Sequence, residues 1–329
     1  MKLDLQRLAH LPVSLFSMIL GLAGWSIALQ KAEHTFGWKF YASPVALAFT
    51  LALFIFLLGL YAYKALAHRN EVLKEFSHPI KMAFFPAMSI GLVLVSTALV
   101  EEHADWSRNL WIVGSSLHLL FTLRIVSIWI HHEKFEINHM NPSWFIPAVG
   151  NILVPVAGMQ HASAEINWFF FSIGFFFWAV LLVLFFNRII FHQPLPQKLL
   201  PTLFILIAPP AVGFVSSVKL LGSVTPFGTV LYFIALFFAL LLTLQFNLFR
   251  KIQFALSWWA YSFPMAAMFL ASNLMYKSTG NPLFSGLSMY FMGVLTLVIL
   301  LLLYHTYIHT YIHPSIHPYI HTYIHTYIH

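Results

Sequence analysis

Residues 199–246 read LLPTLFILIAPPAVGFVSSVKLLGSVTPFGTVLYFIALFFALLLTLQF, and this stretch holds two apolar runs of different character. The run Leu199–Leu221 has prolines in its interior, whereas Pro226–Phe246 has proline only as its first residue. Each run is close to the roughly 20 apolar residues that a helix needs to cross the hydrocarbon core of a bilayer. We therefore interpret the stretch as a hairpin of two transmembrane helices, one interrupted by proline and one regular.

Runs of this kind recur along the chain and predict an all-α polytopic membrane protein with ten transmembrane helices in five hairpins. Their connections are short, so we expect one transmembrane domain over residues 1–304. The predicted spans are Pro12–Gln30, Pro44–Tyr63, Ile80–Val100, Ser107–Trp129, Pro142–Gln160, Ile166–Ile189, Leu199–Leu221, Pro226–Phe246, Phe254–Tyr276 and Pro282–Tyr304.

The composition of the 329 residues agrees with a membrane protein and excludes other classes. Hydrophobic residues make up 60% of the chain and charged residues 8%, whereas soluble domains carry roughly 25% charged residues. The chain has no Cys, which excludes a disulfide-stapled secreted protein. The formal net charge is +7, but the basic residues stand singly between apolar runs, so we expect no nucleic-acid partner.

Proline distinguishes the odd-numbered spans from the even-numbered ones. Even spans have proline only in the first turn, where the missing N–H costs little, and the first span, with Pro12 at its start, fits the odd class imperfectly. An interior proline kinks a helix and frees a carbonyl, which in lipid needs another partner. We therefore expect the odd spans to form an inner, kinked ring and the even spans to face lipid. The interior prolines are Pro201 and the six predicted kink positions of the pore helices, Pro86, Pro147, Pro155, Pro209, Pro210 and Pro264.

The basic residues also predict the orientation of the chain in the membrane. Twelve of the 17 Lys and Arg residues lie on the face that holds the N-terminus and the even-to-odd connections. Because cytoplasmic loops carry the excess of Lys and Arg, we expect a multi-pass protein of the cytoplasmic membrane with both termini in the cytoplasm.

Five stretches give the chain a family resemblance. It resembles the tellurite-resistance/dicarboxylate transporter family, which includes TehA-like proteins and plant slow anion channels. The resemblance implies a quasi-five-fold barrel of five hairpins around a central pore, in a homotrimer. The stretches are Pro12-Val-Ser-Leu-Phe16, His78-Pro79 with Phe84-Phe85-Pro86, Asn141-Pro-Ser-Trp-Phe-Ile-Pro147-Ala-Val, Ala208-Pro-Pro-Ala211 and Trp258-Trp-Ala-Tyr-Ser-Phe-Pro264-Met.

Phe263 is the predicted gate of that pore. The resemblance implies that a phenylalanine before a proline in the ninth span closes the channel, and Phe263 precedes Pro264. A bulky aromatic side chain plugs an apolar channel by its size and by dewetting. Phe16 and Phe85 are candidates for a second constriction because they also lie near kink positions.

The placement of charged residues indicates whether transport is passive or coupled. We find no Asp or Glu in the middle of any predicted span, whereas proton- or sodium-coupled transporters usually need an intramembrane carboxylate or His. His118 lies in the fourth span, where hydrogen-bonded packing and a proton relay are alternative roles. Lys81 and Lys219 are candidates for anion vestibules at the inner and outer mouths, or they extend to the membrane interface.

These features predict a passive, phenylalanine-gated channel for small anions such as chloride and nitrate. The alternative is a proton-coupled carrier of C4-dicarboxylates such as malate, or a tellurite-resistance transporter. We expect neither an enzyme nor a cofactor, because we find no metal-ligand cluster, nucleophile–base pair or phosphate-binding glycine loop in or between the spans.

The C-terminal segment 305–329 repeats a Tyr-Ile-His unit with histidine at every fourth position. Histidines at that spacing could coat one face of a helix and bind a metal ion, or titrate near pH ~6.5. Pro314 and Pro318 interrupt such a helix. We therefore predict a disordered low-complexity extension with no metal site.

Overall fold

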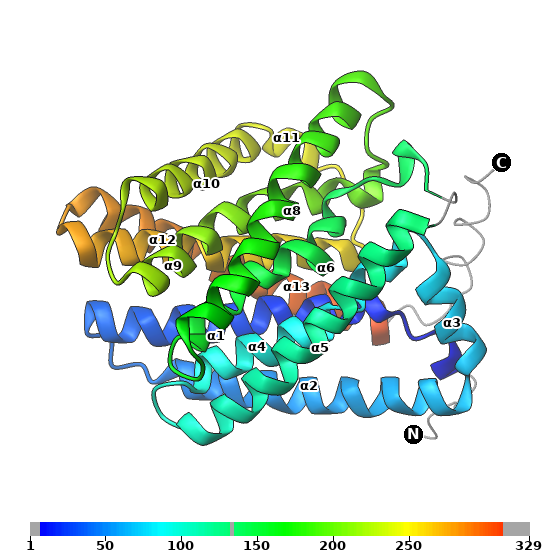
Figure 1. Ribbon diagram of the computed structural model, residues 1–329, viewed down its shortest axis with the longest axis horizontal. Coiled ribbons are helices and arrows are strands. Elements are labelled where there is room, and N and C mark those ends of the chain that lie inside the picture. Colours follow the sequence, from blue (N-terminus) through cyan, green and yellow to red (C-terminus); the bar gives the residue numbers. More distant parts are fainter. Residues whose placement is uncertain (1–6, 132–134, 312–329) are drawn as a thin grey trace.

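The computed structural model describes residues 7–131 and 135–311, and within these ranges the secondary structure is helical throughout (Figure 1). Among the described residues, eight segments are long and apolar enough to cross a membrane. The prediction of an all-α, polytopic membrane protein is therefore confirmed. The segments are Val13–Phe36, Ala42–Ala67, Lys81–Leu99, Ala104–His131, Ala164–Phe191, Gln197–Leu221, Pro226–Leu244 and Pro282–His309.

The even-numbered spans are single α-helices. Figure 1 shows α10 along the upper side of the bundle and α2 along the lower side. The ends of these helices differ from the predicted limits by a few residues, and the last helix continues seven residues past Tyr304. The five helices are α2 (Ala42–Ala67), α5 (Ala104–His131), α8 (Ala164–Phe191), α10 (Pro226–Leu244) and α13 (Pro282–Tyr311).

The odd-numbered spans begin as 3₁₀-helix and continue as α-helix. In the first, third, seventh and ninth spans one 3₁₀ segment leads into one α-helix, and the fifth span breaks into four short pieces. The pairs are η2 (Val13–Leu15) with α1 (Phe16–Phe36), η3 (Lys81–Phe84) with α4 (Ala87–Leu99), η7 (Gln197–Ile207) with α9 (Ala208–Leu221), and η8 (Leu256–Tyr261) with α12 (Ser262–Thr279). The fifth span contains η5 (Pro142–Trp144), α6 (Phe145–Val149), η6 (Gly150–Leu153) and α7 (Pro155–Gly158).

Proline lies at most of these changes of helix type. Pro86 immediately precedes α4, Pro155 begins α7, and Pro264 is the third residue of α12. Pro209 and Pro210 follow the first residue of α9. A proline in the first turn of an α-helix replaces an N–H that the helix does not need, so most of these prolines begin α-segments rather than interrupt them.

Burial separates the two classes of span as the proline pattern predicts. In the first, third and seventh spans, 83%, 72% and 67% of the residues in the most apolar stretch are buried. In the five even spans the corresponding shares lie between 28% and 39%. The odd spans therefore form the interior of the bundle, and the even helices cover it.

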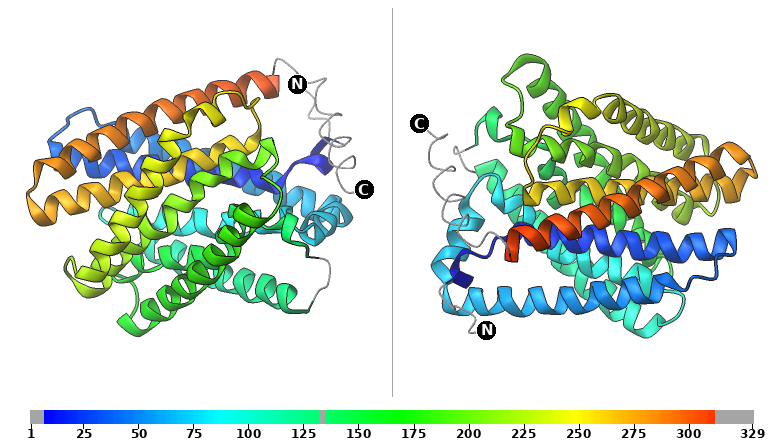
Figure 2. Two further views of the ribbon diagram at one scale, coloured as in Figure 1. Left: turned by 90° about the horizontal axis from the view of Figure 1, so that it is seen from above. Right: turned by 180° about the vertical axis from the view of Figure 1, so that it is seen from behind.

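The inner segments contact one another in a closed ring. α1 packs between α4 and α12, α12 packs against α9, and α9 and α4 both pack against the fifth span. Each inner segment also packs against the even helix that follows it in the chain; for example, α13 runs beside α12 (Figure 2). The order around the ring is the first, third, fifth, seventh and ninth spans, which is the predicted barrel of five hairpins.

Side chains supply partners for the backbone of the broken fifth span. The hydroxyl of Thr122 on α5 donates to Pro147 O at 2.6 Å, and Ser216 on α9 donates to Ile152 O at 2.5 Å. Asn151 Nδ2 donates to Ala148 O at 2.8 Å, and Trp111 Nε1 donates to Val154 O at 3.0 Å. These bonds account for irregular backbone at membrane depth, where an unpaired carbonyl is costly.

A short helix, α3 (Arg69–Ser77), lies in what the sequence suggests is a plain connection. Its Glu75 is buried and pairs with Lys64 of α2, with Nζ and Oε2 2.7 Å apart. Glu75 Oε1 also accepts from Val13 N at 3.3 Å, so the pair holds the start of the first span. The remaining short helices are η1 (Arg7–His10), η4 (Ile137–His139) and α11 (Phe246–Phe249).

Candidate pore

A cavity of about 90 Å³ lies inside the ring of odd spans. All its lining residues belong to the odd spans, and all five odd spans contribute. They are Ser17 and Leu20; Phe84 and Ile90; Phe145, Ile146, Val149, Gly150, Ile152 and Leu153; Ile205, Ala208, Pro209 and Val212; and Trp259, Ala260, Phe263 and Pro264. The cavity is therefore the space that a quasi-five-fold pore would occupy.

The half-buried side chain of Phe263 lines this cavity from the start of α12. A β-carbon on Gly24 of α1 would lie 3.3 Å from Cδ2 of the Phe263 ring. Because glycine has no side chain, α1 and α12 approach each other closely at the level of the ring. The position of Phe263 therefore depends on both helices.

Phe16 and Phe85 lie outside the cavity lining, in the packing layer behind it. Both side chains are buried, and both rings pack edge-on against Tyr61 of α2, with centroid distances of 5.7 Å and 6.1 Å. Phe84 lines the cavity instead of its neighbour Phe85. In a 3₁₀-helix, adjacent residues point about 120° apart, so the sequence Phe84-Phe85-Pro86 does not by itself show which ring faces the centre.

The cavity lining is almost entirely apolar. Its residues include no Asp, Glu, Lys or Arg, and the hydroxyl of Ser17 is a buried polar group without a hydrogen-bond partner. The nearby carbonyls of Pro147 and Ile152 accept hydrogen bonds from side chains, which weakens their negative potential inside the ring. Such a cavity can exclude water while it is narrow and offers an ion no strong binding site.

Two of the six predicted kink prolines, Pro209 and Pro264, line the cavity. Pro86, Pro147, Pro155 and Pro210 are buried within the same inner segments but outside the lining. The structure thus brings all six into the inner ring and separates those at the cavity wall from those behind it.

The two predicted vestibule lysines lie beyond the cavity, near opposite ends of inner segments. Lys81 is the first residue of η3, and Lys219 lies near the end of α9. Lys219 interacts electrostatically with Lys31, Glu101 and Lys277, which lie at the same end of the inner ring. Sequence reasoning missed these three neighbours because they come from three other spans.

His118 lies next to the cavity wall rather than toward lipid. The side chain is buried, and Nδ1 lies 2.9 Å from the hydroxyl of Ser89. Nε2 has no hydrogen-bond partner, and a β-carbon on the cavity residue Gly150 would lie 2.8 Å from it. The ring therefore packs directly behind Gly150.

The start of the histidine-rich segment belongs to α13. The rings of His305 and His309 pack against Phe254, with centroid distances of 5.3 Å and 4.9 Å. Residues 312–329, which hold most of the predicted low-complexity extension, lie outside the described residues. In the described part of the chain, no three His, Asp or Glu side chains are grouped so that they could hold a metal ion.

Comparisons with known proteins find similar chains among channels and transporters. The family model described as voltage-dependent anion channel matches residues 10–307. The S-type anion channel SLAH3 of Arabidopsis thaliana is 30% identical over 275 residues, which cover 80% of this chain and 43% of SLAH3. The uncharacterized transporter MJ0576 of Methanocaldococcus jannaschii is 28% identical over 70% of this chain and 73% of its own. The tellurite resistance protein TehA homolog of Haemophilus influenzae is 27% identical over 83% of both chains.

Proposed function

The chain belongs to the voltage-dependent anion channel family, and from this we propose that it is a passive channel for small monovalent anions such as chloride and nitrate. The observation that carries the proposal is the apolar cavity that all five odd spans enclose, with Phe263 in its wall. The plant relatives are named S-type anion channels, which supports anions as the class of transported ion.

Phe263 is the gate in this proposal. Its ring lies in a cavity of about 90 Å³ that has no charged lining residue, so a small displacement changes both the width and the wetting of the pore. The ring is held by α1 and by the backbone next to Pro264. Opening therefore needs a rotamer change or a small shift between α1 and α12, without a large movement of the bundle.

Passive conduction is supported by the chemistry of the lining. A coupled carrier needs a group that changes its protonation or binds a cation at the transport site, and the lining residues include no carboxylate and no histidine. His118 is separated from the cavity by the backbone of Gly150. The alternative, a proton-coupled C4-dicarboxylate carrier or a tellurite transporter, remains as an outcome of the test.

The proposal extends to the membrane and the assembly. We place both termini in the cytoplasm, because most Lys and Arg residues lie on that face. The large apolar side chains exposed on the even helices are suited to lipid and to contact with other copies in a homotrimer.

Reversal potentials in planar bilayers test the transport mode. The protein is reconstituted, and the reversal potential is measured under a chloride gradient with and without a pH gradient. A passive anion channel follows the chloride gradient alone. A reversal potential that shifts with the pH gradient in a fixed ratio would support the coupled carrier instead.

A further inference from the structure

Three lysines lie at the outer ends of adjacent inner helices. Lys31 belongs to α1, Lys277 to α12 and Lys219 to α9. These helices are neighbours in the ring, because α12 packs against both α1 and α9. The electrostatic interactions of Lys219 with Lys31 and Lys277 agree with this placement. The lysines therefore form a basic group, here called the outer lysine group, at one end of the cavity-lining segments.

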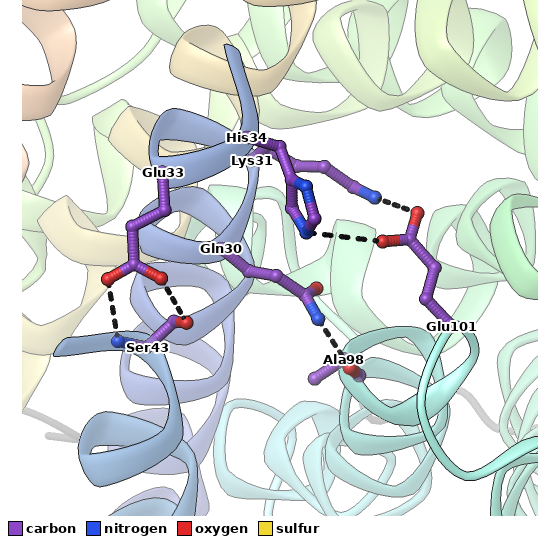
Figure 3. Close-up of polar contacts among 7 residues, drawn as sticks. All are labelled: Gln30, Lys31, Glu33, His34, Ser43, Ala98 and Glu101. Atoms are coloured by element: carbon purple, nitrogen blue, oxygen red, sulfur yellow. Dashed lines mark hydrogen bonds and ion pairs between the residues drawn. The ribbon is translucent and has the colours of Figure 1, made fainter. Parts of the chain in front are cut away.

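Glu101 is the carboxylate that faces this group. It follows α4, and its Oε1 lies 2.5 Å from Nζ of Lys31. Its Oε2 lies 3.8 Å from Nε2 of His34, also on α1 (Figure 3). In the described part of the chain, neither Lys219 nor Lys277 has an ion pair of its own. Glu101 therefore neutralises one of the three lysines and leaves two.

Glu33, the other acidic residue drawn in Figure 3, has a different role. Glu33 points toward Ser43 at the start of α2 (Figure 3). Its Oε1 accepts from Ser43 N at 3.1 Å and from Ala42 N at 2.7 Å. Its second oxygen accepts from the Ser43 hydroxyl. Glu33 thus fixes the connection between α1 and α2, and Glu101 is the carboxylate paired with the lysine group.

We propose that Glu101 sets the electrostatic potential of the outer mouth and so the rate at which small anions enter from outside. The proposal rests on the proposed channel function and adds a residue that controls it. An unopposed group of three lysines would attract anions strongly and release them slowly. Conduction needs binding weak enough for the ion to leave, and the carboxylate lowers the attraction by one charge.

Glu101 acts as a fixed charge near neutral pH. The hydrogen bond from Lys31 holds the pKa of this carboxyl below its usual value, and the positive charges of Lys31 and Lys219 lower it further. The side chain is 44% exposed, so its charge also acts on ions in the surrounding solution.

The contact between α1 and α4 does not depend on this ion pair. Gln30 Nε2 donates to Ala98 O at 3.4 Å (Figure 3), and the two helices pack against each other. Substitution of Glu101 by glutamine should therefore change the charge at the mouth while the helices stay in place.

A thiol reporter measures the potential without requiring conduction. Because the chain has no cysteine, Ser223→Cys places a single thiol on the exposed segment just after α9. The rates of its modification by an anionic and by a cationic methanethiosulfonate reagent are compared in reconstituted protein. At about 0.01 M salt, a unit charge at a separation of about 10 Å changes each rate by up to about two-fold in opposite directions, so Glu101→Gln should raise the anionic-to-cationic rate ratio by up to about four-fold.

Matched variants identify the source of that change. Lys219→Gln should lower the ratio by a similar factor, and Glu101→Asp, which keeps the charge, should leave it near the parent value. Glu71→Gln and Lys74→Gln on α3 remove charges at the opposite end of the bundle, where α3 packs against the start of the third span, and should have little effect. The differences should vanish at about 1 M salt, where the Debye length is only about 3 Å.

Chloride conductance, measured in the Phe263→Ala background, tests the effect of Glu101 on anion entry. At about 0.01 M salt, where the Debye length is about 30 Å, Glu101→Gln should raise chloride entry from the outer side about two-fold. An unchanged rate ratio in the thiol assay, or a change that persists at high salt, would overturn the role of Glu101. If the thiol assay gives the expected rate ratios but no variant conducts anions, the proposed channel function is contradicted instead.

Discussion

The ring of Phe263 on α12 rests against Gly24 on α1, and a β-carbon on Gly24 would lie 3.3 Å from Cδ2 of that ring. The same β-carbon would lie 2.9 Å from Cβ of Ala266, one turn further along α12. Such short contacts require one of the two helices to shift. The packed position of the proposed gate therefore depends on a missing side chain on the neighbouring inner helix.

Gly24→Ala should raise the basal anion current several-fold, because the added methyl group makes the observed position of the Phe263 ring less favourable. Bilayer recordings at equal protein density provide the measurement. In the Phe263→Ala background the same glycine substitution should add no further current, since the ring it acts on is gone. An equal increase in both backgrounds would mean that Gly24 acts through helix spacing alone.

Ser216→Ala should destabilise the protein by about 1–3 kcal/mol, because Ile152 O in the broken fifth span loses its side-chain donor. Ser217→Ala is the matched control. Ser217 is also buried on α9, but its hydroxyl bonds to Phe214 O within the same helix, and we expect its removal to cost less than about 1 kcal/mol. Thermal unfolding in detergent measures both, and equal losses would contradict the role assigned to Ser216.

Lys64→Met should destabilise the protein by about 3–5 kcal/mol, because it leaves the buried Glu75 carboxylate without its cation. Lys64→Met combined with Glu75→Leu should recover part of the loss, since no buried charge then remains unpaired. Glu71→Gln on α3, the helix that carries Glu75, removes the more exposed ion pair with Lys74. It should leave the unfolding temperature nearly unchanged. A similar loss of stability from Glu71→Gln would contradict the buried Lys64–Glu75 pair as the main contribution of α3 to stability.

The effect of Glu101→Gln on chloride entry should be constant from about pH 7 down to about pH 5. The pKa of Glu101 is lowered from 4.5 by the hydrogen bond from Lys31 and by nearby positive charges, so the carboxylate stays charged above its ordinary pKa. The effect should disappear only as the pH falls through that lowered value. Low-salt recordings in a His34→Asn background exclude a contribution of the His34 side chain, and a loss of the effect near pH ~6 would contradict the expectation.

The architecture was largely predictable because it follows from periodic features of the sequence. Apolar runs indicate the spans, and prolines such as Pro86 and Pro264 mark the segments that need partners for freed carbonyls. Those segments are the buried ones in the structure. The breakage of the fifth span into short pieces was not predictable, because the donors Thr122 and Ser216 that permit it lie in other spans.

For the candidate pore, the sequence predicted a lining residue only where a single position carries the signal. Phe263 was identified through the family resemblance, by its place before Pro264 in the ninth span, and it lines the cavity. Its role as the gate stays a prediction. The choice between Phe84 and Phe85 depends on the 3₁₀ register at a chain bend, which composition does not reveal. Glu75 and Glu101 lie in connections, where acidic residues are usually solvated, and their pairing with lysines is a property of the folded bundle.

The most direct test of the central claim is the anion current of Phe263→Ala in planar bilayers. If the Phe263 ring closes an otherwise passive apolar pore, its truncation should raise chloride current at least about ten-fold, because removing a dewetting plug lowers the barrier to the ion. The reversal potential should still follow the chloride gradient. A folded variant whose current and reversal potential equal those of the parent protein would contradict the account.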